Sequence, residues 1–162
     1  MFDLIHDLYG HQEWADAQHW RALHAFPPAL EDERLRQGLF HIHAVQQVWL
    51  ARWQGVDMGF PQIEDYPRTQ DLYPFAKSCH AALKAYLSLR SESDLPTPVT
   101  YRNIHGETFS QPLGDLLLHL PYHTQYHRGQ TARAMVELGS HMPATDLVVW
   151  QRAGRPKAEW PE

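Results

Sequence analysis

Three histidines near the C-terminal end of the chain have the spacing of a metal site. His119, His123 and His127 are four residues apart, in a segment whose apolar pattern predicts a helix. Residues at positions i and i+4 are neighbours on a helix surface, about 6 Å apart along the axis, so consecutive imidazoles can converge on one point. Two imidazoles from one helix and a third from elsewhere would bind a transition metal and leave a coordination position open for chemistry.

Spacing alone does not establish such a site. The chain has 12 histidines among 162 residues, so about one pair at this spacing is expected by chance. His123 and His127 interrupt an apolar stripe that we expect to face the core, formed by Leu116, Leu120, Ala134 and Leu138. Buried imidazoles need either a hydrogen-bonding partner or a metal ion, and at this point both interpretations are open.

A third ligand would have to come from another helix, and His41 is the best candidate. It lies in a strongly apolar segment, on a stripe with Val45 and Val48. His43 is about 200° further around the same helix, so His41 and His43 cannot both face one inward site. His119 is rotated about 40° from His123 and about 80° from His127, which favours a place beside the ligands over a fourth ligand.

The rest of the chain predicts four long helices. Three of them cover residues 2–26, 31–54 and 69–90, and the last begins at about residue 112, after a cap at Ser110 or Gln111, and ends near Leu138 before Gly139. Residues 99–102 and 107–110 alternate around a turn and predict a short β-hairpin. We expect one all-α domain over residues 1–162, an antiparallel four-helix bundle, with the loop 55–68 crossing its end.

Composition excludes several classes of function. The net charge is −5 and no run of Lys or Arg occurs, which argues against nucleic acid as a partner. No apolar stretch approaches the ~20 residues of a membrane span, and the N-terminus lacks the basic residues of a signal peptide, so we expect a cytoplasmic protein. Cys79 is the only cysteine and is interpreted as a buried, inert thiol.

Two long motifs resemble the DinB/YfiT-like family of damage-inducible proteins. They are His41-Ile-His-Ala-Val-Gln-Gln-Val-Trp-Leu-Ala-Arg-Trp-Gln-Gly and Tyr122-His-Thr-Gln-Tyr-His-Arg-Gly-Gln, and Trp14-Ala-Asp and Pro143-Ala-Thr-Asp-Leu-Val extend the resemblance over nearly the whole chain. Members are four-helix bundles that bind a divalent metal through three histidines. The resemblance therefore implies His41, His123 and His127 as ligands, with His41 preferred because it precedes Trp49 by eight residues.

The chain departs from the family pattern at two places in the last motif. Tyr126 stands where many relatives have a further histidine, which is not a required ligand. Pro121 lies inside the predicted helix and should free the carbonyl of Leu117 and kink the helix. Gln130 matches the family motif and is interpreted either as a group that orients a ligand or as a packing residue. His11 is interpreted as a core histidine with one hydrogen bond.

The resemblance also implies a chemistry. Characterised relatives include transferases that join a low-molecular-weight thiol to an electrophile, a thiol-dependent isomerase and metal-dependent hydrolases. We therefore expect a metal-dependent thiol S-transferase with zinc or nickel as the metal, and a small-molecule thiol and an electrophile as substrates. The alternatives are a hydrolase and a non-catalytic stress-response module for metal binding or dimerisation. A homodimer is expected, and no catalytic residue beyond the ligands is identified.

Overall fold

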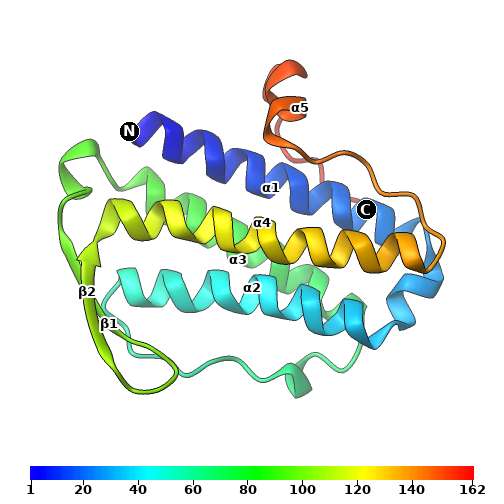
Figure 1. Ribbon diagram of the computed structural model, residues 1–162, viewed down its shortest axis with the longest axis horizontal. Helices are drawn as coiled ribbons and strands as arrows, with labels where there is room; N and C mark the ends of the chain where they lie inside the picture. Colours follow the sequence, from blue (N-terminus) through cyan, green and yellow to red (C-terminus); the bar gives the residue numbers. More distant parts are fainter.

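The structure is a computed structural model that describes residues 1–162, and it is mainly helical (Figure 1). Its four long helices are α1 (Phe2–His24), α2 (Glu33–Trp53), α3 (Leu72–Ser88) and α4 (Leu113–Glu137). A short helix, α5 (Leu147–Arg152), follows near the C-terminus. Strands β1 (Pro98–Arg102) and β2 (Thr108–Pro112) form the expected antiparallel hairpin immediately before α4. None of the helices combines the length and the apolar character that a membrane span requires.

The long helices do not alternate in direction, as a simple antiparallel arrangement would. Leu39 near the start of α2 shares a cluster with Leu72 at the start of α3, and Trp53 at the end of α2 contacts Tyr86 at the end of α3. Hence α2 and α3 run the same way, while α1 and α4 run the opposite way (Figure 1). The connection between α2 and α3 must return along the molecule, so it does not cross one end as expected.

The helix ends follow local signals, with one exception. The Asp32 side chain accepts a hydrogen bond from the Leu35 backbone N–H at 3.0 Å and caps α2. Gly139, with φ at 93°, ends α4 as predicted. The predicted cap of α4 at Ser110 or Gln111 is wrong, because both residues belong to β2. The strand leads directly into the helix, and the hairpin thereby fixes where α4 starts.

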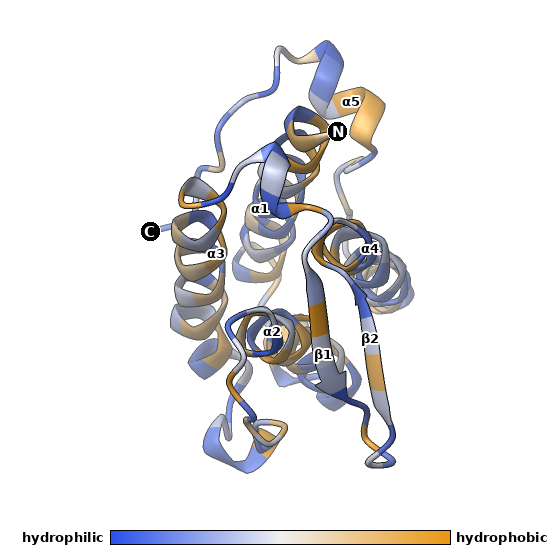
Figure 2. Cartoon of the chain, turned by 90° about the vertical axis from the view of Figure 1, so that its left-hand side faces the viewer, coloured by the Kyte–Doolittle hydropathy of each residue, from blue (hydrophilic) through white to orange (hydrophobic).

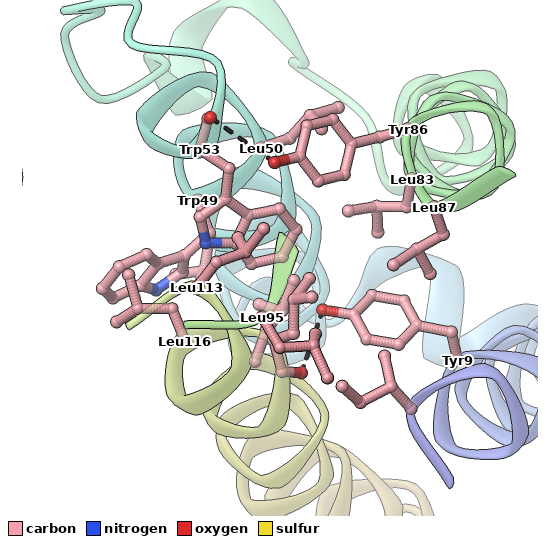
Figure 3. Close-up of a cluster of buried hydrophobic side chains, with 14 residues drawn as sticks. Tyr9, Trp49, Leu50, Trp53, Leu83, Tyr86, Leu87, Leu95, Leu113 and Leu116 are labelled. Atoms are coloured by element: carbon pink, nitrogen blue, oxygen red, sulfur yellow. Dashed lines mark hydrogen bonds between the residues drawn. The ribbon is translucent and has the colours of Figure 1, made fainter. Parts of the chain in front are cut away.

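The core consists of two large hydrophobic clusters, one at each end of the long helices. The cluster nearer the hairpin is shown in Figure 3, where side chains of α2 and α3 meet those of α1 and α4. The second cluster lies towards the start of α2 and contains Trp20, Leu35, Phe75 and Met135. Between the two clusters all four helices contribute buried polar side chains, among them Asp16, Gln46, His80 and Arg128. A small third cluster joins α5 to α1 through Trp150 and Trp14.

The backbone carbonyl that Pro121 leaves without a helical partner finds one on another helix. Pro121 has no N–H, so the Leu117 carbonyl cannot accept the usual hydrogen bond within α4. The buried Tyr9 hydroxyl of α1 donates to this carbonyl at 3.1 Å (Figure 3). The proline is therefore tolerated inside α4, and its defect contributes a link between α1 and α4.

This link predicts a stability effect. Replacing Tyr9 by Phe should lower the free energy of unfolding by about 1–3 kcal/mol, because the Leu117 carbonyl would be buried without a partner. Urea unfolding followed by circular dichroism measures the change. Tyr126→Phe on the exposed face of α4 is the matched control and should stay within about 0.5 kcal/mol of the native chain. Equal stability of the two variants would contradict the role assigned to Tyr9.

Candidate metal centre

The structure brings His41 of α2 together with His123 and His127 of α4. One ring nitrogen from each residue lies within 4.8 Å of the other two. The Nε2 atoms of His41 and His123 are 3.3 Å apart, and the His127 ring centroid is 4.3 Å from that of His41 and 4.6 Å from that of His123. All three side chains are half-buried, where α2 and α4 pack against each other.

This geometry fits the donor set of a divalent metal ion. Two imidazole nitrogens bound tetrahedrally at about 2.0–2.1 Å from one ion would be about 3.4 Å apart, close to the separation of the His41 and His123 Nε2 atoms. The His127 Nδ1 lies 3.0 Å from Gln130 Oε1. Because this amide oxygen can only accept, Nδ1 carries the proton and donates it, which leaves the Nε2 lone pair free for a metal. Of the two interpretations of Gln130, the structure favours the orienting role.

Burial favours the metal-binding protonation state of two histidines of the group, His41 and His123. Burial, together with smaller effects of the neighbouring His127, His41 and His119, lowers the pKa of His123 to about 4. Burial, with a smaller effect of His127, also lowers the pKa of His41. Neutral imidazoles are the form that binds a metal, so at neutral pH neither residue has to lose a proton first.

A glycine allows the two helices to approach closely enough for the group to form. A Cβ atom placed on Gly38 of α2 would lie only 2.7 Å from Cγ2 of Thr131 on α4. Gly38 is one helical turn before His41, and Thr131 is one turn after His127. A larger residue at position 38 would have to displace the buried Thr131 side chain or push α2 and α4 apart next to the histidines.

His119 lies outside the three-histidine group, as its rotation on the helix predicted. It is exposed, packs edge-on against Trp49 with ring centroids 5.2 Å apart, and its ring is 5.5 Å from that of His123. Phe60, from the segment after α2, stacks on the His41 ring, with ring centroids 6.1 Å apart. An aromatic ring therefore packs directly against the histidine group, and a second one, Trp49, lies next to it behind His119.

The buried face of α4 differs from the one that the apolar stripe predicted. His123 and His127 lie on the flank of the helix, and the centre of its buried face carries Thr124, Arg128 and Thr131. Arg128 is only 1 % exposed, and its Nε donates to Asp16 Oδ1 at 2.7 Å. The prediction that both histidines face the core was wrong because a salt-bridged arginine occupies that place.

A second group of possible ligands lies inside the protein, formed by Asp16, His43 and His80. Asp16 Oδ2 accepts a hydrogen bond from His80 Nε2 at 2.7 Å, and His43 Nδ1 is paired with Gln46 Oε1 at 3.0 Å. Burial alone would raise the pKa of the Asp16 carboxyl, but the Arg128 guanidinium, with help from His80, balances its charge and holds that pKa well below its usual value. A cation would have to displace these bonds beside a positive charge, so the half-buried histidine group is the better metal site.

Sequence reasoning missed most of this buried polar layer. Asp16 and His80 were not singled out, although Gln12, Asp16 and His19 recur at helical spacing on one face of α1, a signal that could have indicated a polar seam.

The predictions for Cys79 and His11 agree with the structure. Cys79 is buried and its thiol pKa is raised to about 12, so it is inert, and His11 makes one hydrogen bond, with its Nε2 2.8 Å from the Thr145 carbonyl oxygen.

Fold and site together define a helical protein with a histidine group that could hold a metal ion. Comparison with family models then identifies the chain, because the DinB family model matches residues 1–158. The protein belongs to the DinB family, and the resemblance of its motifs to that family is confirmed. A search of curated proteins finds no match to this sequence.

The buried layer predicts a dependence of stability on acid. Burial lowers the pKa of His19 from 6.5 to about 4, so the folded chain excludes a proton that the unfolded chain binds below pH 6.5. The free energy of unfolding should therefore fall as the pH drops from 6.5 to 4, by up to about 1.4 kcal/mol per pH unit for this residue.

Urea unfolding of the metal-free protein at several pH values measures this slope. His19→Gln should make the slope shallower over that interval, whereas His105→Gln, at the exposed turn of the hairpin, should leave it unchanged. An unaltered slope in His19→Gln would show that the residue is not held neutral by its surroundings.

Proposed function

We propose that this DinB-family protein is a metal-dependent enzyme, a thiol S-transferase, whose four long helices form a bundle of the family type. His41, His123 and His127 would hold one divalent metal ion. The observation that carries the proposal is the convergence of three half-buried imidazoles, with no carboxylate among them. Three neutral ligands would leave the metal its full positive charge, and their partial exposure leaves access for a substrate.

The residues of the chain have simple roles in this chemistry. A bound metal of this kind would stabilise a thiol in its thiolate form at neutral pH. Gln130 orients the His127 ring, and Phe60 and Trp49 line the approach with apolar surface. In the transfer the thiol loses its proton to solvent, its sulfur forms a bond to the electrophilic carbon, and the leaving group departs with the electron pair of the broken bond.

The donor set favours some metals and reactions over others. Imidazole and water ligands suit zinc and nickel, which are the metals that we propose. A hydrolase would use a general base near the metal to activate water, and the histidine group contains no carboxylate to serve as one. The thiol reaction requires no protein base, which is why we place it ahead of hydrolysis.

Metal binding itself provides the first test. The native chain should bind one equivalent of zinc or nickel, and the double variant His123→Ala/His127→Ala should lose this stoichiometric binding because only one imidazole of the group remains. Equilibrium dialysis with elemental analysis measures the ratio. The control, His105→Ala/His141→Ala, removes two exposed histidines and should bind metal normally. Full metal retention in the first variant would rule out the proposed ligands.

Turnover separates an enzyme from a binding module. Metal-loaded protein is mixed with each common cellular thiol and a chromogenic alkylating electrophile, and thioether formation is followed by absorbance. We expect a rate that depends on the metal and disappears in His123→Ala/His127→Ala. If no thiol is consumed faster than in the absence of protein while stoichiometric metal is bound, the transferase is excluded and the non-catalytic module is favoured.

A further inference from the structure

Four arginines of the chain have no carboxylate partner, and three of them gather at one end of the molecule. Seven of the 11 arginines form ion pairs with Asp or Glu. The exceptions are Arg52, Arg90, Arg102 and Arg152. The first three line two adjoining cavities beside the hairpin, whereas Arg152 is exposed on α5. An acidic protein thus keeps a local surplus of positive charge at one place.

Arg52 is held in a fixed position within this group. Its guanidinium lies over the Trp49 ring, 4.6 Å from the ring centroid, and 5.1 Å from that of Tyr101, which belongs to β1. One of its N–H groups donates to the Arg102 carbonyl at 2.9 Å. Arg52 is half-buried, and burial lowers its pKa. The charge is therefore partly desolvated and prealigned, and its remaining N–H groups have no protein acceptor.

A cavity of about 780 Å³ lies next to this guanidinium. It is enclosed by the end of α2, the segment 55–60 and the hairpin, whose arrangement is seen end-on in Figure 2. Arg52 and Arg102 supply positive charge to the lining, Asp57 supplies one negative charge without pairing with Arg52, and Val48, Met58 and Phe60 supply apolar surface. This volume and mixed lining are typical of a site for a small organic molecule.

The cavity and the histidine group share one wall residue, Phe60. Phe60 lines the cavity and also stacks on the His41 ring. His41, Val48 and Arg52 lie on one stripe of α2, and 11 residues of helix separate the outer two by about 16 Å. His119 packs against Trp49, between the histidine group and Arg52. Burial and, to a smaller extent, the positive charge of Arg52 lower the pKa of His119.

We propose that this cavity binds the anionic end of the substrate, a carboxylate or a similar oxyanion on a partly apolar body, through Arg52 with support from Arg102. The inference rests on the proposed function, since the other end of the same molecule would reach the histidine group past Phe60. Planar guanidinium and oxyanion groups pair through two parallel hydrogen bonds, which suits a prealigned arginine without a partner. The metal would then act on one end of a ligand while Arg52 holds the other.

The test compares two fluorescent probes that differ in charge. Anilinonaphthalene sulfonate and N-phenylnaphthylamine share a ring system, but only the first is an anion, and both are small enough for the cavity. The native chain should bind the sulfonate more tightly than the neutral probe. Arg52→Met, which keeps the stem that packs on Trp49, should weaken sulfonate binding at least tenfold and leave binding of the neutral probe unchanged. Arg102→Met should produce a smaller loss in the same direction.

Matched controls keep the result specific. Arg152→Met removes an unpaired arginine away from the cavity and should bind both probes as the native chain does. The proposal is overturned if Arg52→Met and Arg152→Met lose sulfonate affinity equally, if both probes weaken together in Arg52→Met, or if the native chain does not distinguish the probes. If Arg52→Met does not fold, Arg102→Met decides between the same outcomes.

The same variants separate this inference from the proposed function. Arg52→Met should still bind one equivalent of metal, and His123→Ala/His127→Ala should still bind the sulfonate. If the native chain neither binds metal nor turns over a thiol, the proposed enzymatic function is excluded, but the proposed anion site is not affected. If the cavity binds the sulfonate and the neutral probe equally well, the proposed anion site is excluded, but the proposed metal site is not affected.

Discussion

The buried ion pair between Asp16 and Arg128 is the constraint on which the arrangement of the helices depends. Both side chains are inaccessible to water, and a buried charge is tolerated only when it is paired and hydrogen-bonded. The pair joins α1 to α4, His80 adds α3, and Gln46 approaches Asp16 at 3.4 Å from α2. A slip of one helix along another would break these bonds, so the polar layer fixes the axial register of all four helices.

The spacing of the proposed metal ligands depends on the same register, although these ligands lie on other faces of α2 and α4. His127 is adjacent in sequence to Arg128, and His41 is two residues before His43, so these two ligands lie at the level of the buried layer but on another face of their helices. Gly38 lets α2 and α4 approach closely at that level. A shift of one helical turn, about 5.4 Å, would exceed the spacing at which the imidazole nitrogens can share one ion.

The direction of the helices explains why a cavity forms beside the hairpin. Because α2 and α3 run the same way, the chain leaves α2 at the hairpin end and has to return along the molecule before α3 begins (Figure 1). Its first residues, 55–60, pass in front of the end of α2 and meet the hairpin there. The long return connection thus encloses space next to Arg52 and brings Phe60 onto the His41 ring.

The sequence by itself determined the local features of this protein. Helical periodicity, the turn of the hairpin and Gly139 predicted the elements to within a few residues, since these signals act between neighbours in the chain. The spacing of His123 and His127, with His41 from its apolar stripe and from the resemblance, also predicted which three histidines lie together. The family was recognised from motifs that are themselves local.

Only the tertiary structure decided which side chains occupy the interior between the helices and in which direction the helices run. Arg128 and His80 are surface residues by type, and they are buried because Asp16, more than 60 residues away from either, satisfies them. The same holds for Pro121, because the Leu117 carbonyl that it frees accepts a hydrogen bond from Tyr9 of another helix. Such partners are distant in the chain, and periodicity within one helix carries no information about them.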